Sequence, residues 1–95
     1  MEKISHAFPT VTEVGLDKAN IGEVPKWLLF LPKMDFVRLA NNHLNELPEW
    51  FTAIPTLKNV YAQNNHIQSI EWGQHIEKIL LQGNRGKLKQ GPLHQ

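Results

Sequence analysis

Residues 34–56 read MDFVRLANNHLNELPEWFTAIPT and carry the pattern on which the fold depends. The first, fourth, sixth, eleventh and fourteenth places of this stretch are apolar: Met34, Val37, Leu39, Leu44 and Leu47. Asn42 holds the ninth place, and Pro48 follows the last apolar residue. Apolar residues at this spacing, followed by an asparagine, predict a short strand and then a tight turn, with the apolar places facing inward.

The same pattern occurs in the preceding stretch, because residues 11–33 align with residues 34–56 without a gap over all 23 places. The inward places there hold Val11, Val14, Leu16, Ile21 and Val24. Two prolines and a tryptophan also recur at one spacing, pairing Pro25 with Pro48, Trp27 with Trp50, and Pro32 with Pro55. Ala19 stands where the asparagine is expected, so the first repeat should lack that side chain's hydrogen bonds.

Two further repeats follow, and both are shortened. Residues 57–75 keep the inward places Leu57, Val60, Ala62, Asn65, Ile67 and Ile70. Residues 76–84 keep only the first part, with Ile76, Ile79, Leu81 and Asn84. We expect PKWLLFLP (25–32) and PEWFTAIP (48–55) to form about one helical or 3₁₀ turn each, and EWGQH (71–75) to cross as a turn.

Repeats of this spacing resemble those of the leucine-rich repeat family, and the resemblance covers residues 11–84. It implies an α/β fold, a short right-handed solenoid with a concave parallel sheet of about four strands and irregular or 3₁₀ convex segments. We expect Asn42, Asn65 and Asn84 to form an inward ladder whose amides satisfy backbone groups in the turns. Residues 1–10 are interpreted as an N-terminal cap, and residues 85–95 as a C-terminal cap remnant with a flexible basic tail.

The resemblance also implies a binding surface, since the concave face is the usual one in this family. Eight outward strand residues form the candidate partner-binding set: Glu13, Phe36, Arg38, Asn59, Tyr61, Gln63, Lys78 and Leu80. Aromatic residues and arginine on a rigid sheet are typical of protein-binding hot spots. Two alternatives stay open: Phe36 merely pairs with Tyr61 as an ordinary surface residue, or the convex tryptophans bind, although packing explains these more simply.

Composition narrows the setting and the chemistry. The 95 residues have room for one domain, and a net charge of +1 gives no general reason to expect nucleic acid or an acidic membrane. The absence of cysteine removes disulfides, thiolate metal sites and cysteine nucleophiles, and it favours a reducing, cytoplasmic setting. An exported bacterial effector is the alternative. The longest apolar run, residues 27–31, is far too short to span a membrane.

Candidate catalytic and metal-binding groups are few. His43 and His66 follow the ladder asparagines in adjacent repeats and should be neighbours, but no acidic residue shares their register, so we predict no metal site. Ser5 and Ser69 are the only serines, and no glycine-rich phosphate loop follows a strand. We therefore predict a protein that is not an enzyme, with no cofactor and no small-molecule substrate.

The predicted function is protein–protein interaction through the concave face, in an adaptor, inhibitor or effector role. One alternative is a nucleic-acid-associated protein that uses Arg85, Lys87 and Lys89 of the tail, although three cations are more typical of a solvated terminus. Another is a leucine-rich repeat fragment of a larger enzyme or effector. A weakly covered C-terminal end also makes self-association through that end an open alternative.

Overall fold

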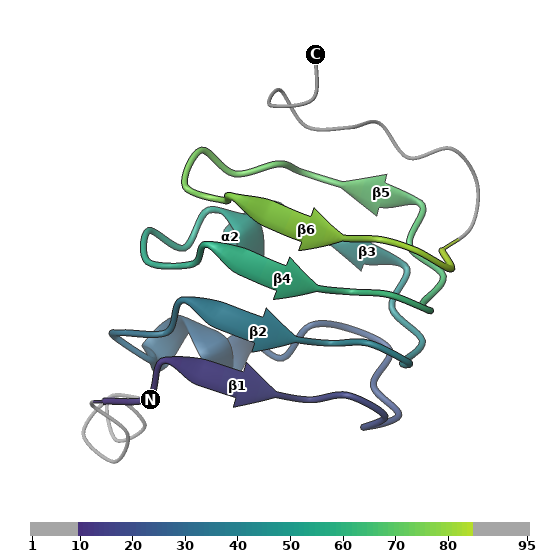
Figure 1. The fold of residues 1–95 in the computed structure, drawn as a ribbon, viewed down its shortest axis with the longest axis horizontal. Coiled ribbons are helices and arrows are strands. Elements are labelled where there is room, and N and C mark those ends of the chain that lie inside the picture. The colour runs from purple at the N-terminus through teal and green to yellow at the C-terminus, as the bar shows by residue number, and fades with distance from the viewer. Residues whose placement is uncertain (1–9, 85–95) are drawn as a thin grey trace.

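The computed structural model describes residues 10–84 and shows a small α/β fold built on a parallel sheet (Figure 1). Its four strands follow one another in chain order: β1 (Glu13–Gly15), β2 (Phe36–Arg38), β4 (Asn59–Tyr61) and β6 (Lys78–Leu80). Between successive strands the chain returns behind the sheet, so that each strand lies parallel to the previous one. The predicted parallel sheet of four strands is thus confirmed. Residues 1–9 of the expected N-terminal cap and the expected tail, 85–95, lie outside the described residues.

The sequence period sets the register of this sheet. Glu13 pairs with Phe36, and Phe36 pairs with Asn59, so each step between these strands covers 23 residues. Asn59 pairs with Lys78 after 19 residues, which is the length of the shortened third segment. The side chains that share a place in the pattern therefore lie in rows across the sheet.

The inward places form one apolar core behind the sheet. Its centre consists of completely buried side chains: Met34, Val37, Leu39, Leu44, Leu57, Val60, Ala62 and Ile67 at inward places, and Leu28 and Phe51 from the return segments. The equivalent residues at the two ends of the sheet are only partly buried and pack against this centre: Val11, Val14, Leu16 and Ile21 at one end, and Ile79 and Leu81 at the other. Each segment thus completes its burial against its neighbours, as in stacked structural units.

The return segments contain the helical turns that the sequence predicts. The 3₁₀ helix η1 (Lys26–Phe30) follows Pro25, and the helix α2 (Glu49–Thr52) follows Pro48. Proline suits these starts because it has no N–H to leave unpaired in the first turn. Residues 71–75 make no helix and cross as the expected turn. Gly73 permits this short path, because a Cβ at that position would collide with the backbone carbonyl of Thr52.

A second, two-stranded sheet lies in the return segments and was not predicted. The strand β3 (Glu46–Leu47) pairs in parallel with β5 (Ser69–Ile70). Leu47 and Ile70 hold the fourteenth place of their segments, so their pairing follows the same register as the main sheet. Two-residue strands are too short to show a two-residue period in sequence, which is why the pattern did not reveal them.

The turns after the main strands have a left-handed backbone at one recurring place. The eighth residue of each segment has a positive φ: Lys18 at 56°, Asn41 at 61°, Asn64 at 58° and Gly83 at 79°. Asparagine and glycine tolerate this conformation, whereas lysine adopts it at a cost. The Asn-Asn and Gly-Asn pairs at residues 41–42, 64–65 and 83–84 were the sequence signal for it.

The expected asparagine ladder is present. Asn42 and Asn65 are buried, and Asn84 is partly buried. Each amide serves the preceding segment as well as its own: Asn84 accepts from the Ile67 N–H at 2.9 Å and donates to the Ala62 carbonyl at 2.8 Å. The ladder therefore ties neighbouring turns together through buried backbone groups.

Because each asparagine bonds to the preceding segment, the first turn is satisfied even though Ala19 stands at the asparagine place. The carbonyl oxygen of the Asn42 side chain accepts from the N–H groups of Ala19 at 2.9 Å and Ile21 at 3.2 Å. The first turn thus receives its amide from the second segment, so that the missing side chain at Ala19 leaves these two N–H groups satisfied.

Candidate functional site

Twelve residues point away from the core on the main sheet, and we name their surface the outer sheet face. The first row contains Glu13, Phe36, Asn59 and Lys78; the second contains Gly15, Arg38, Tyr61 and Leu80. Backbone hydrogen bonds continue beyond the strands and add a third row of Asp17, Ala40, Gln63 and Gln82. All eight residues of the predicted partner-binding set therefore lie on this one face. Whether they bind a partner stays a prediction.

An aromatic pair occupies the middle of the outer sheet face. The rings of Phe36 and Tyr61 meet edge to face, with centroids 4.7 Å apart and an interplanar angle of 71°. The ammonium group of Lys78 lies 6.0 Å from the centroid of the Tyr61 ring. Phe36 therefore pairs with Tyr61, as one of the two alternatives expected. Both rings are only partly buried, so part of each remains accessible for contact.

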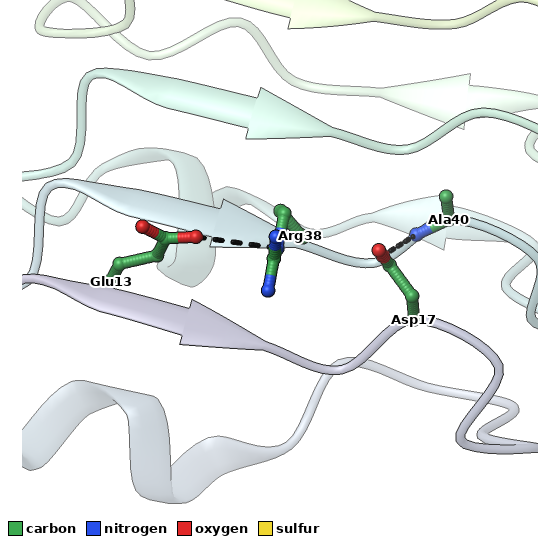
Figure 2. A network of polar contacts seen from close by, with 4 residues as sticks. All are labelled: Glu13, Asp17, Arg38 and Ala40. Atoms are coloured by element: carbon green, nitrogen blue, oxygen red, sulfur yellow. Dashed lines mark hydrogen bonds and ion pairs between the residues drawn. The ribbon is translucent and has the colours of Figure 1, made fainter.

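An ion pair lies beside this aromatic pair, on the β1 side (Figure 2). The Nε of Arg38 lies 3.4 Å from a carboxylate oxygen of Glu13, and both side chains are nearly half exposed. The guanidinium group spreads over Gly15, where a Cβ would collide with it. Glycine at this position therefore lets the arginine lie close to the sheet. An exposed pair of this kind contributes only about 0–1 kcal/mol to folding.

Asp17 also lies on the β1 side and has a structural contact that the sequence did not reveal. Its carboxylate accepts a hydrogen bond from the backbone N–H of Ala40 at 2.9 Å, across to the neighbouring segment (Figure 2). This bond holds the side chain on the outer sheet face. The cross-segment register would have placed the two residues in neighbouring positions, but it does not specify which backbone group a short acidic side chain reaches.

The charges of the outer sheet face are distributed unevenly from β1 to β6. Glu13 and Asp17 belong to the β1 segment, and Lys78 belongs to the β6 strand. Of the ion pairs within residues 10–84, one joins Arg38 to Glu13 and the other joins Lys58 to Glu77, so Lys78 has no carboxylate partner there. The β1 side of the face therefore carries two carboxylates, of which Glu13 is paired with Arg38, and the β6 side carries Lys78, which lies near the Tyr61 ring and has no carboxylate partner in the described residues.

Comparison with models of protein families, with curated proteins and with solved structures finds no match for this chain.

Gln63 is a further polar residue of this face with unmet hydrogen-bonding capacity. Its side-chain carbonyl oxygen is buried and accepts no hydrogen bond from any residue in 10–84. A buried acceptor without a donor is costly.

The two histidines lie in the turns beside the asparagine ladder. The rings of His43 and His66 stack with centroids 6.2 Å apart and an interplanar angle of 13°, which confirms that they are neighbours. In the described part of the chain, no three histidine, aspartate or glutamate side chains gather in a group that could hold a metal ion. Neither helix of residues 10–84 has the length and apolar character needed to traverse a lipid bilayer.

The tryptophan side of the molecule is more mixed in character. Trp27 is 39% exposed, whereas Trp50 is partly buried and meets Phe51 edge to face at 6.0 Å. The ammonium group of Lys26 lies 6.0 Å from the Trp50 ring centroid. A shallow groove of about 860 Å³ is lined in part by Trp50, and its charged lining residues are Glu23, Lys26 and Glu46. The contact of Trp50 with Phe51 supports packing as its first role.

Proposed function

We propose that this chain is a small leucine-rich repeat solenoid that binds a protein through its outer sheet face, the face that corresponds to the concave side in that family. The observation that carries the proposal is the gathering of Phe36, Arg38, Tyr61, Lys78 and Leu80 on one face of a parallel sheet. Tyrosine and arginine are enriched at the energetic centres of protein interfaces, and phenylalanine is enriched in interfaces generally. The 23-residue step between paired strands supports the family assignment.

The proposed mechanism is presentation of side chains that are already ordered. The ring of Phe36 is held against Tyr61, and the guanidinium group of Arg38 is held by Glu13 above Gly15. Side chains that are fixed before binding lose less conformational entropy when a partner docks. Such a surface suits an adaptor, an inhibitor or an effector, and no catalytic group is needed for any of these roles.

The cysteine-free composition supports a cytoplasmic setting for this binding, since small secreted domains often depend on disulfides, whereas disulfides are rare in a reducing compartment. An exported effector is compatible with the same composition.

The experiment that tests the proposed function is affinity capture from native lysate, read by mass spectrometry. The wild-type chain is compared with a Phe36→Ala/Tyr61→Ala variant that is first shown to fold. A Leu29→Ala variant is the control, because it removes an exposed apolar side chain that does not belong to the outer sheet face. A protein captured by the wild type and the control but lost from the first variant is the expected result. Equal capture by all three chains would move the binding surface elsewhere.

A further inference from the structure

We propose that the protein bound by the outer sheet face is a second copy of the same chain. The two copies pack face to face about a two-fold axis that runs parallel to the strands and passes between β2 and β4. This inference rests on the proposed function, because it names the partner of that same face. In this arrangement β1 of one copy lies over β6 of the other, and β2 lies over β4.

The uneven charge of the face is the first argument for this arrangement. It places the carboxylate of Glu13 opposite the ammonium group of Lys78 of the second copy. The two-fold axis repeats this contact, so that one interface contains two such pairs. Lys78 has no carboxylate partner within residues 10–84, and the second copy supplies one.

The central and third rows are also complementary in this arrangement. The aliphatic part of the Arg38 side chain lies opposite Tyr61 of the second copy, and its guanidinium group, which spreads over Gly15, lies opposite Leu80 of the second copy. Ala40, the smallest side chain of the third row, lies opposite the longer Gln63 of the second copy. Asp17 lies opposite Gln82 of the second copy, whose side-chain amide can donate to the carboxylate.

The other face-to-face arrangement is much less favourable. A two-fold axis perpendicular to the strands would put β1 of one copy over β1 of the other. The acidic side chains of the two β1 segments, Glu13 and Asp17, would then face one another. Opposed like charges across an interface are unfavourable and exclude a binding mode. The charge pattern therefore selects the axis parallel to the strands.

The size of the face predicts a weak and reversible dimer. Four strands spaced about 4.8 Å apart, each with five residues that rise about 3.3 Å per residue, give the face an area of roughly 300 Å² on each copy. This area does not include the additional surface of the protruding side chains. Stable complexes typically bury about 800 Å² on each partner. We therefore expect weak association, and concentrations up to about 1 mM are needed to detect the dimer.

Sedimentation equilibrium of the full chain with a charge-swap pair tests the proposal. Glu13→Lys alone and Lys78→Glu alone each create two like-charge contacts, so each variant by itself should dimerise at least tenfold more weakly than the wild type. In a one-to-one mixture of the two variants both contacts become attractive again, and heterodimers should form with about wild-type affinity. Lys26→Glu, a charge reversal outside the face, is the matched control and should leave dimerisation within about twofold of the wild type. Thermal melts establish that every variant is folded, which matters most for Glu13→Lys because it also loses the pair with Arg38.

Three results would overturn the proposal: a wild-type chain that stays monomeric at 1 mM, a dimer that both charge reversals leave intact, or weakened single variants that the mixture does not restore. A monomeric wild type together with a lysate protein lost from Phe36→Ala/Tyr61→Ala would overturn the dimer alone and leave the proposed function standing with a different partner. A monomeric wild type with no such protein would overturn both.

Discussion

The side-chain amide of Asn65 donates a hydrogen bond across 2.9 Å to the backbone carbonyl of Leu39, a residue of the preceding segment. Its carbonyl oxygen accepts from the N–H of Leu44 in that same segment at 3.0 Å. The amide also donates to the carbonyls of Ala62 and Gln63 in its own turn. One buried side chain thus satisfies backbone groups of two successive turns, so its loss should affect both.

Asn65→Ala should lower the free energy of unfolding by about 1–3 kcal/mol, because it leaves buried backbone groups without partners. Urea denaturation followed by circular dichroism measures the change. Asn45→Ala is the matched control: Asn45 is exposed, and its loss should change stability by about 0.5 kcal/mol or less. Equal effects of the two substitutions would show that the ladder contributes little to folding.

Much of this fold was predictable because the pattern of apolar residues repeats along the sequence. The 23-residue match between residues 11–33 and 34–56 predicts the pairing of Val14 with Val37, and the structure has that register. A fixed register then places Arg38 and Tyr61 in one outward row, so the composition of the outer sheet face was also predictable. The helical turns after Pro25 and Pro48 follow from recurring prolines.

What escaped prediction depends on local geometry that the period does not contain. The reach of Asp17 to the Ala40 N–H and of Arg38 across Gly15 depends on side-chain conformation. The pairing of β3 with β5 involves too few residues to leave a pattern. Lys18 has a left-handed backbone because it holds the same place in its segment as Asn41, although lysine has no preference for that conformation.

Leu39→Ala should destabilise the protein by about 2–5 kcal/mol, because this side chain is completely buried in the centre of the core. Thermal or urea unfolding measures the loss. Leu29→Ala provides the comparison, since Leu29 is 46% exposed and its truncation should cost well under half as much. An unchanged melting temperature for Leu39→Ala would contradict its inward position.

Lys18→Gly should raise the free energy of unfolding by about 0.5–1 kcal/mol. Lysine has a φ of 56° at this position, and glycine removes the clash of the Cβ in that conformation, partly offset by its greater entropy in the unfolded chain. Lys33→Gly is the control, because Lys33 does not belong to the positive-φ residues and should lose stability on the same exchange. A melting temperature that falls for both variants would argue against strain at Lys18.

Arg38→Ala should separate folding from binding on the outer sheet face. The ion pair of Arg38 with Glu13 is nearly half exposed, so its removal should change the free energy of unfolding by less than about 1 kcal/mol. The same substitution removes the side chain whose aliphatic part faces Tyr61 of the second copy in the proposed dimer, and dimerisation should weaken by about fivefold to tenfold or more, since the axis repeats the contact. Urea unfolding and sedimentation equilibrium are measured on the same preparation, with Lys33→Ala as a control outside the face. A large loss of stability would instead assign Arg38 to the scaffold, because a side chain that only presents itself to a partner has no such effect on the isolated chain.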